Sequence, residues 1–245
     1  MHNGCLMYVN PSEHIQQQLF WYGYYEKEAI LVWEAFVEQD TIVVDIGANT
    51  GYYSMVAAPK ARQVFAFEPV PSLRKQLQEN ISLNKFNNIH IQPYAISAHS
   101  GNAILYISGD DNTGMSGLQQ PDNFSGKTET ADMITLDEWV INNNTDQLNL
   151  IKMDTEGNEM NILAGMKNTI EKYHPVIFME VIAALLKNNG HTPADIYQRL
   201  FASGYSAYEP VTSLKLNRLI EPKEANIVIF LPAGFKIPRS VTIID

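Results

Sequence analysis

The chain has 245 residues, of which 45% are hydrophobic and 18% charged, and its formal net charge is -10. This length and composition fit one ordinary folded domain, and they exclude a disordered tail, a collagen-like repeat and a disulfide scaffold. The acidic balance argues against nucleic-acid binding through bulk charge. Cys5 is the single cysteine, so an intramolecular disulfide and a cysteine-based zinc cluster are excluded, and one thiol fits a reducing compartment.

Membrane and export signals are not evident in the sequence. Charged or polar residues break every apolar run well short of the ~20 residues that a membrane-spanning helix needs. The first residues lack the basic start and apolar core of a signal peptide. We therefore expect a cytoplasmic protein without a membrane span, and the sequence indicates no oligomeric state.

Alternating strand and helix patterns define the expected fold. Continuous β-branched and apolar runs between helices are typical of parallel strands that are buried on both faces. Amphipathic helices are expected from Ser72, after Gly157 and from Thr192. This alternation predicts an α/β fold with a doubly wound, mostly parallel sheet and helices on both faces. The strands predicted in this way are 41–46, 64–68, 89–94, 104–107, 150–154 and 176–181.

Other segments complete the expected organisation. Residues 1–40 are expected to form a helical and aromatic segment that packs on a core domain of residues 41–245. Residues 108–130, which are rich in glycine, asparagine, aspartate and serine, are expected to form an inserted loop or hairpin of the kind that often carries function. The last strands, near 205–208 and 227–231, are joined without an evident helix, and we expect them to form an antiparallel pair at one edge of the sheet.

The strongest chemical signal lies where the first strand ends. Asp45 is followed by Gly47 and Gly51, and then by a predicted helix. Glycines let the backbone adopt conformations closed to other residues and approach a ligand closely, and the N–H groups that begin a helix can point toward that ligand. A buried acid beside two glycines is costly without a partner, which favours a ligand-binding loop over a plain strand–turn–helix connection.

Glu68 ends the next strand, at a distance similar to that of the acid that binds a ribose in dinucleotide folds. A carboxylate can accept hydrogen bonds from both ribose hydroxyls, and the alternative is an acid that caps the following helix. The glycine loop lacks the G-x-G-x-x-G spacing that binds a pyrophosphate, and no P-loop motif is present. A nucleoside ligand without phosphates therefore fits better than a dinucleotide.

Carboxylates also cluster after a later strand. Asp154, Glu156 and Glu159 follow one strand, and Glu180 ends the next. Parallel strands end at the same edge of a sheet, so we expect these acids on one rim, where clustered acids raise one another's pKa and one can serve as a base. Alternatively, Glu156 and Glu159 complement the dipole of the following helix and Asp154 is structural. A divalent cation is a further option, but no metal is predicted.

The remaining candidates carry less information. The six histidines show no metal-ligand spacing, and only His174 is kept, as a distant base candidate. No G-x-S-x-G elbow is present, which leaves an α/β-hydrolase unsupported. The aromatic segment 20–26 is more typical of core or helix-packing surface than of a ligand site.

Taken together, the segments VVDIGANTGYYS, FAFEPVP and LIKMDTEGNE resemble FkbM-type methyltransferases, a branch of the class I S-adenosylmethionine-dependent methyltransferases. GYYEKE, GMSGL, LDEWV and PVIFMEV extend the resemblance, in the right order, over most of the chain. The resemblance implies a Rossmann-like, seven-stranded sheet with the last strand antiparallel, in a class I methyltransferase domain over residues 41–245. It also implies that Tyr25 and Glu26 cover the cofactor pocket.

The resemblance further implies contacts with S-adenosylmethionine. The loop from Asp45 to Gly51 would hold the methionine end of the cofactor, and Glu68 would bind the ribose hydroxyls. The chain near Ala95 would flank the adenine through main-chain groups, because it offers no acid. The implied cofactor-binding residues are Asp45, Gly47, Ala48, Asn49, Gly51, Tyr52, Glu68, Pro69 and Ala95.

The sequence therefore predicts an S-adenosylmethionine-dependent O-methyltransferase with S-adenosylhomocysteine as its product. The family association implies a hydroxyl acceptor on a sugar, a glycan or a secondary metabolite. Asp154 and Glu156 are the candidate catalytic residues, as proton acceptor and orienting group. One alternative is a nicotinamide-dependent oxidoreductase on a similar sheet, and another is a cofactor-binding protein that has lost turnover.

Overall fold

The computed structural model of the chain describes residues 1–108, 116–120, 124 and 126–244. Within these residues, the central sheet has nine strands, in the spatial order β12 (Thr242–Ile244), β10 (Lys215–Leu219), β9 (Tyr205–Val211), β11 (Ala225–Pro232), β8 (Val176–Val181), β7 (Leu150–Met153), β1 (Ile42–Ile46), β2 (Gln63–Phe67) and β3 (Ile89–Gln92). The run from β8 to β3 is parallel throughout, and β1 lies between β7 and β2.

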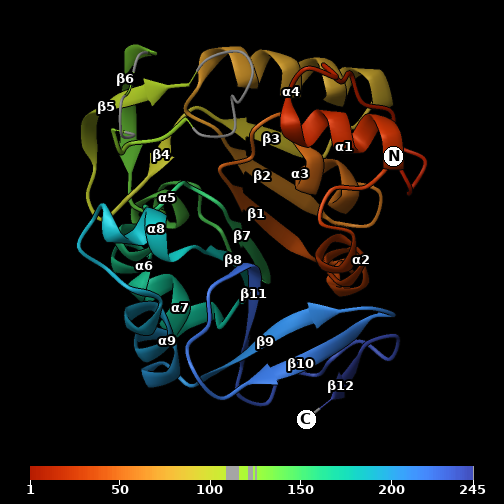
Figure 1. Cartoon of the computed structure of the whole chain (residues 1–245), viewed down its shortest axis with the longest axis vertical. Helices are drawn as coiled ribbons and strands as arrows, with labels where there is room; N and C mark the ends of the chain where they lie inside the picture. Colours follow the sequence, from red (N-terminus) through yellow and green to blue (C-terminus); the bar gives the residue numbers. More distant parts are fainter. Residues whose placement is uncertain (109–115, 121–123, 125, 245) are drawn as a thin grey trace.

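Helices cover both faces of this sheet (Figure 1). They are α1 (His14–Tyr22), α2 (Lys27–Phe36), α3 (Tyr52–Ala57), α4 (Pro71–Asn84), α5 (Leu136–Asn142), α6 (Glu159–Gly165), α7 (Lys167–Tyr173), α8 (Ala183–Lys187) and α9 (Pro193–Ala202). Val43 packs in the core with α2 and α3, whereas its neighbour Val44 packs in the core with α5 and α6. Because alternate strand residues face opposite helical layers, the inner strands are mostly apolar, with Asp45, Lys152 and Glu180 as the charged exceptions in β1, β7 and β8. The predicted α/β arrangement is confirmed.

The three helices predicted from the sequence agree with the structure to different extents. α4 buries Leu73, Leu77 and Ile81 on one face, as the spacing predicts. α9 begins after Thr192, whose backbone N–H donates to the Asp195 carboxylate at 2.7 Å. The segment after Gly157 forms two short helices, α6 and α7, rather than one. None of the helices in the described part of the chain combines the length and apolar character needed to cross a membrane.

The prediction of seven strands with an antiparallel edge pair was wrong in its details. β9 and β11 do pair antiparallel, but β10 and β12 extend the sheet beyond β9, so this pair is not at the edge. Ser213 and Leu214 both adopt left-handed φ values, of 65° and 56°, and reverse the chain into the β9–β10 hairpin. Such turns usually carry Asn-Gly or Asp-Gly, so the sequence offered no clear hairpin signal here.

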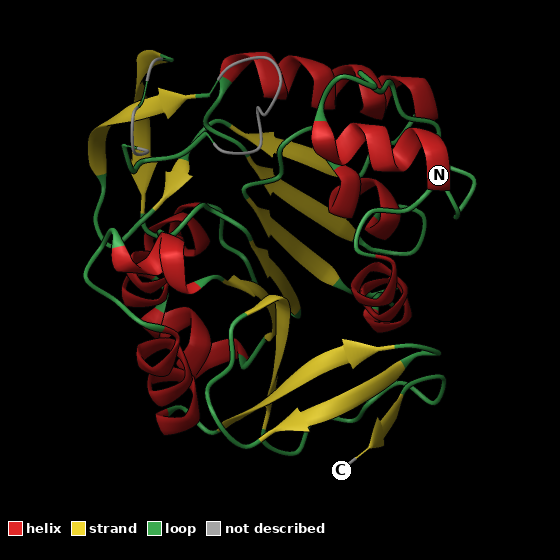
Figure 2. Ribbon diagram, in the orientation of Figure 1, coloured by secondary structure: helices red, strands yellow, loops and turns green. Residues whose placement is uncertain are grey.

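Residues 104–107 do not join the central sheet, which corrects a second expectation. They belong to β5 (Gly101–Ile107), which pairs antiparallel with β6 (Lys127–Ile134) in a smaller sheet completed by β4 (Ala95–Ile96) (Figure 2). Only Leu105 of β5 is buried, so the strand is not covered on both faces. The β5–β6 pairing agrees with a hairpin, and the part of the predicted insertion at 109–115, 121–123 and 125 lies outside the described residues.

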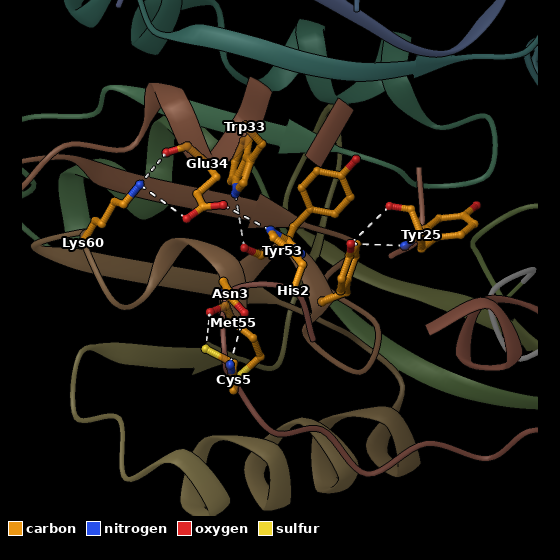
Figure 3. Close-up of polar contacts among 10 residues, drawn as sticks. His2, Asn3, Cys5, Tyr25, Trp33, Glu34, Tyr53, Met55 and Lys60 are labelled. Carbon is orange, nitrogen blue, oxygen red and sulfur yellow. Dashed lines mark hydrogen bonds and ion pairs between the residues drawn. The ribbon is translucent and has the colours of Figure 1, made fainter. Parts of the chain in front are cut away.

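The first residues of the chain contact both α2 and α3 (Figure 3). The Cys5 thiol donates to the backbone carbonyl of Met55 at 3.4 Å, and His2 Nε2 lies 3.1 Å from Glu34 Oε2. These contacts bring α1 toward the carboxyl ends of the strands, where Ile15 lines a cleft.

Candidate functional site

The carboxyl ends of β1, β2, β7 and β8 open onto one cleft. A smaller hollow shares Gly47, Glu68 and Asp154 with it. Pro69 and Ala95 line the smaller hollow, and Gly51 lines neither. The other predicted site residues line the larger cleft: Asp45, Gly47, Ala48, Asn49, Tyr52, Glu68, Asp154 and Glu156.

Asp45 forms part of the wall of the cleft and is only 2% exposed. The Ser54 hydroxyl on α3 donates a hydrogen bond of 2.6 Å to Asp45 Oδ2. Burial raises the pKa of Asp45 to about 6, even though the Ser54 hydrogen bond and the positive charge of Lys152 act in the opposite direction. The carboxyl therefore lies close to its titration range at neutral pH.

The two glycines of the first loop are required by the packing of the protein itself. Gly47 has a φ of 77°, and a Cβ at this position would lie 1.9 Å from the backbone oxygen of Asp154. Gly51 has a φ of 94°, and its Cβ would lie 2.2 Å from Leu77 Cδ1 on α4. Sequence reasoning assigned the glycines to ligand approach and missed these contacts, because Asp154 and Leu77 are distant along the chain.

Glu68 lies between the two hollows and lines both. Its Oε2 accepts the N–H of Asn49 and its Oε1 accepts the N–H of Val70, each at 2.8 Å. Burial raises the pKa of Glu68 to about 7, despite the opposing effects of these two bonds and of Arg74. The bond to Val70 supports the start of α4. This agrees in part with the alternative expected from the sequence, in which Glu68 caps the following helix. Each carboxylate oxygen keeps capacity to accept a further hydrogen bond.

Three acids of the larger cleft cluster at the ends of β7 and β8, which lie across β1 from β2 and Glu68. Carboxylate oxygens of Asp154, Glu156 and Glu180 all lie within 4.8 Å of one another. Glu156 and Gly157 have φ values of 56° and 97°, and these left-handed residues turn the chain after β7. Burial raises the pKa of Glu156 to about 8, with Asp154 adding to the effect. Burial and the same neighbouring carboxylates raise the pKa of Glu180 well above its ordinary value.

Glu159 has a different role from its neighbours in the sequence. Its Oε1 accepts the backbone N–H of Thr155 at 3.1 Å and the Thr155 hydroxyl at 3.0 Å. It is 2% exposed and begins α6. Glu159 therefore closes the β7–α6 turn, which agrees with the helix-start alternative, whereas Glu156 faces the cleft.

Sequence reasoning missed Lys152 as a member of the site. Its Nζ lies 2.9 Å from Asp154 Oδ2 and 4.7 Å from the centroid of the Tyr53 ring. The spacing of Lys152 and Asp154 carried a signal, because residues two apart on a strand point to the same face. The side chain of Lys152 is only 1% exposed.

Tyrosines from two elements form another wall of the cleft. The Tyr52 hydroxyl accepts the backbone N–H of Tyr25 at 3.1 Å and lies 3.2 Å from its carbonyl oxygen (Figure 3). Both residues line the cleft, as expected. Glu26 instead accepts a hydrogen bond of 2.7 Å from the Tyr53 hydroxyl, and it lines a separate hollow beside α2.

The smaller hollow is mostly apolar. Besides Pro69 and Ala95, its walls include Phe67, Ile96 and Leu105. His174, the distant base candidate, lies elsewhere. It precedes β8, whereas Glu180 lies near the carboxyl end of that strand, so His174 is at the wrong end of the sheet to reach the cleft.

Solved structures share the fold of this chain. The chain is similar to the FkbM methyltransferase of Methylobacillus flagellatus, with a TM-score of 0.51 and 16% identity, over 89% of this chain and 48% of that one. It is also similar to SMU.1697c of Streptococcus mutans, whose structure is in complex with S-adenosylhomocysteine, with a TM-score of 0.50 and 10% identity, over 84% of this chain and 96% of that one. The fold is thus an α/β fold similar to methyltransferase structures.

The sequence match is more specific than the fold. Residues 45–207 match the methyltransferase FkbM domain, which is more than half of the chain. The chain therefore belongs to the FkbM methyltransferase family, and the resemblance inferred from its motifs is confirmed.

Two relatives with assigned activities are similar over part of their length. The hexuronic acid methyltransferase AglP of Haloferax volcanii is 30% identical over 62% of this chain and 61% of its own. The 2-O-methyltransferase NoeI of Sinorhizobium fredii is 28% identical over 54% of this chain and 60% of its own. The matched regions thus span about three fifths of each of these relatives.

Proposed function

We propose that the chain is an S-adenosylmethionine-dependent methyltransferase that methylates a hydroxyl group of a sugar, a glycan or another small molecule. The observation that carries the proposal is a cleft lined by Glu68, which follows β2, and by the Asp154 cluster at the ends of β7 and β8, with β1 between them. Membership of the family supports methyl transfer. The activities named for AglP and NoeI support an oxygen acceptor on a sugar.

The residues present fit an adenosine-containing cofactor. Glu68 has lone pairs left for ribose hydroxyls, and it lies where the larger cleft meets the apolar hollow. We propose that the hollow beside Pro69 and Ala95 takes the base and that the loop from Asp45 to Asn49 takes the methionine end.

The proposed chemistry needs little covalent help from the protein. When bound, S-adenosylmethionine supplies a methyl group on a sulfonium, and its sulfur keeps the electron pair of the broken C–S bond in S-adenosylhomocysteine. Asp154 takes the proton of the acceptor hydroxyl as that oxygen bonds to the methyl carbon. Glu156, protonated at neutral pH because burial raises its pKa to about 8, donates a hydrogen bond that orients the acceptor. Correct alignment supplies ~7–11 kcal/mol of the barrier reduction.

The oxidoreductase alternative receives less support. A dinucleotide needs a glycine loop that binds its pyrophosphate, and Gly47 and Gly51 are instead packed against Asp154 and Leu77. A measurement of turnover tests the alternative of a non-catalytic cofactor-binding protein.

Calorimetric titration with S-adenosylmethionine, S-adenosylhomocysteine and NAD tests the cofactor, and we expect only the first two to bind. Release of S-adenosylhomocysteine is then measured with free hexuronic acids, methyl glycosides of neutral sugars, and phenols. Release with a sugar supports the proposal, and release with phenols alone redirects the acceptor class. Binding of NAD would favour the oxidoreductase, and cofactor binding without turnover on any acceptor would favour the non-catalytic alternative.

A further inference from the structure

Lys152 is a buried lysine at the base of the cleft. It is 1% exposed, and it pairs in register with Asp45 on β1 and Phe178 on β8. Burying an ammonium group is costly unless it is paired and hydrogen-bonded. Tyr53 and Phe178 around it belong to an apolar core, which an apolar side chain would complete without that cost. The charge at this position therefore calls for an explanation beyond folding.

The nearest partner of Lys152 is Asp154. The two residues lie on the same side of the sheet, and Lys152 Nζ donates to Asp154 Oδ2 at 2.9 Å. The Tyr53 ring covers the ammonium group from the side of α3, with its centroid 4.7 Å away. The hydrogen bond engages one carboxylate oxygen of Asp154.

Acidic groups surround this ion pair from every neighbouring element. Burial alone would lower the pKa of Lys152, but attraction by Asp154, Glu26 and Glu180 raises it, so the ammonium stays charged. Its positive charge in turn opposes protonation of nearby carboxyls. The titratable groups that face Lys152 or Asp154 are Tyr25 and Glu26 before α2, Asp45 of β1, Tyr53 of α3, Glu156 and Glu159 after β7, and Glu180 of β8.

We propose that Lys152 is a positioning residue for methyl transfer, whose buried ammonium group fixes Asp154 Oδ2 so that Oδ1 is presented to the acceptor hydroxyl. This inference rests on the proposed function. The hydroxyl proton passes to Asp154 Oδ1, the acceptor oxygen bonds to the methyl carbon, and the sulfur keeps the electron pair of the C–S bond. Lys152 donates its hydrogen bond throughout and exchanges no proton.

Lys152→Met and Lys152→Arg separate charge from volume, because methionine keeps an unbranched chain and arginine keeps the charge. We expect Lys152→Met to lower kcat by roughly 10²-fold while the Kd of S-adenosylhomocysteine and the acceptor KM change less than about threefold. Lys152→Arg should restore part of kcat, because the guanidinium group keeps the positive charge.

The double variant Lys152→Met/Asp154→Asn gives the decisive control. If Lys152 acts through Asp154, adding Lys152→Met to the Asp154→Asn variant lowers kcat by less than about threefold more than Asp154→Asn alone. Multiplicative losses, or cofactor affinity that falls in parallel with kcat, would show a merely structural lysine. If Lys152→Met does not fold, a Lys152→Arg variant whose cofactor affinity falls in parallel with kcat overturns the proposal. A wild-type protein without cofactor binding and turnover contradicts the proposed function itself.

Discussion

The two sides of the cleft hold their carboxyl groups by different means. Glu68 accepts backbone N–H groups from Asn49 and Val70, whereas Asp154 is held by the side chain of Lys152. Backbone donors are fixed by the fold, so Glu68 is positioned as firmly as the loop and helix around it. The Asp154 side also holds Glu156, whose pKa is raised by burial to about 8. We infer that the Glu68 side is suited to recognition and the Asp154 side to reaction.

The largest expected effect is a loss of stability at Gly47, which lies in the loop after β1, between the Glu68 and Asp154 sides of the cleft. In Gly47→Ala the new Cβ would lie 1.9 Å from the backbone oxygen of Asp154, and backbone atoms on both sides resist movement. We expect the free energy of unfolding to fall by more than about 4 kcal/mol, the range of severe steric and backbone defects. Chemical denaturation of the two purified proteins measures the difference.

Gly190→Ala is the matched control. Gly190 also has a positive φ, of 75°, but nothing lies within 4 Å of its added Cβ. Only the left-handed backbone penalty of about 1–2 kcal/mol should remain there. Equal losses in the two variants would mean that the contact between the Gly47 loop and the end of β7 contributes nothing.

The next largest effect concerns the reaction side alone. Asp154→Asn keeps the size of the side chain but removes the proton acceptor, so turnover should fall by roughly 10²–10⁴-fold. Cofactor affinity should stay nearly intact. The exposed Asp132→Asn serves as a control for the chemical change itself. Normal turnover in Asp154→Asn would refute the division between the two sides and require another base.

The recognition side should respond in the opposite way. Glu68→Ala should weaken cofactor binding by roughly 1.5–3 kcal/mol, the range for hydrogen bonds to a charged group. Because Glu68 also holds the N–H groups of Asn49 and Val70, the free energy of unfolding should fall as well, by about 1–2 kcal/mol. Calorimetry and denaturation measure the two losses, and unchanged cofactor affinity beside lost stability would leave Glu68 with a capping role only.

Patterns along the chain predicted most of the fold but not all of its contacts. The apolar runs gave the inner strands, since a strand buried on both faces has few other possible sequences. The Ser213–Leu214 turn was not predictable in this way, because neither residue type favours a left-handed conformation. The strand-end acids were found from spacing. Lys152 stands beside them in the sequence but received no role, because the sequence does not show that its ammonium group is buried against Asp154.

The pH dependence of stability offers a smaller and more general test of the recognition side. Burial raises the pKa of Glu68 to about 7 and that of Asp45 to about 6, so between their ordinary values and these values the folded state binds more protons than the unfolded state. The stability they contribute is present in full below about pH 4 and is lost as pH rises through 6 to 7. We expect these two carboxyls to remove roughly 1–3 kcal/mol of stability from the cofactor-free protein between pH 5 and 8. The raised pKa values of Glu26, Glu156 and Glu180 act in the same direction.

Glu68→Gln should flatten this dependence, because the glutamine does not titrate. Exposed Glu129→Gln should leave it unchanged. Denaturation curves at several pH values provide the measurement. A stability that rises with pH in the wild-type protein, or a slope that Glu68→Gln leaves intact, would contradict the assignment of a buried titrating carboxyl.

The smallest expected effect concerns metal ions at the reaction side. The oxygens of Asp154, Glu156 and Glu180 are close enough together to share a cation, but the Lys152 ammonium already lies 2.9 Å from Asp154 Oδ2. A divalent ion on the same oxygens would be repelled by that ammonium group, and protonation of Glu156, with its pKa near 8, would weaken its binding further. We therefore expect a chelator to change turnover by less than about twofold. Activity that disappears with the chelator and returns with Mg²⁺ would show that the acids bind a metal ion, and that Lys152 is not the cation on which the reaction side depends.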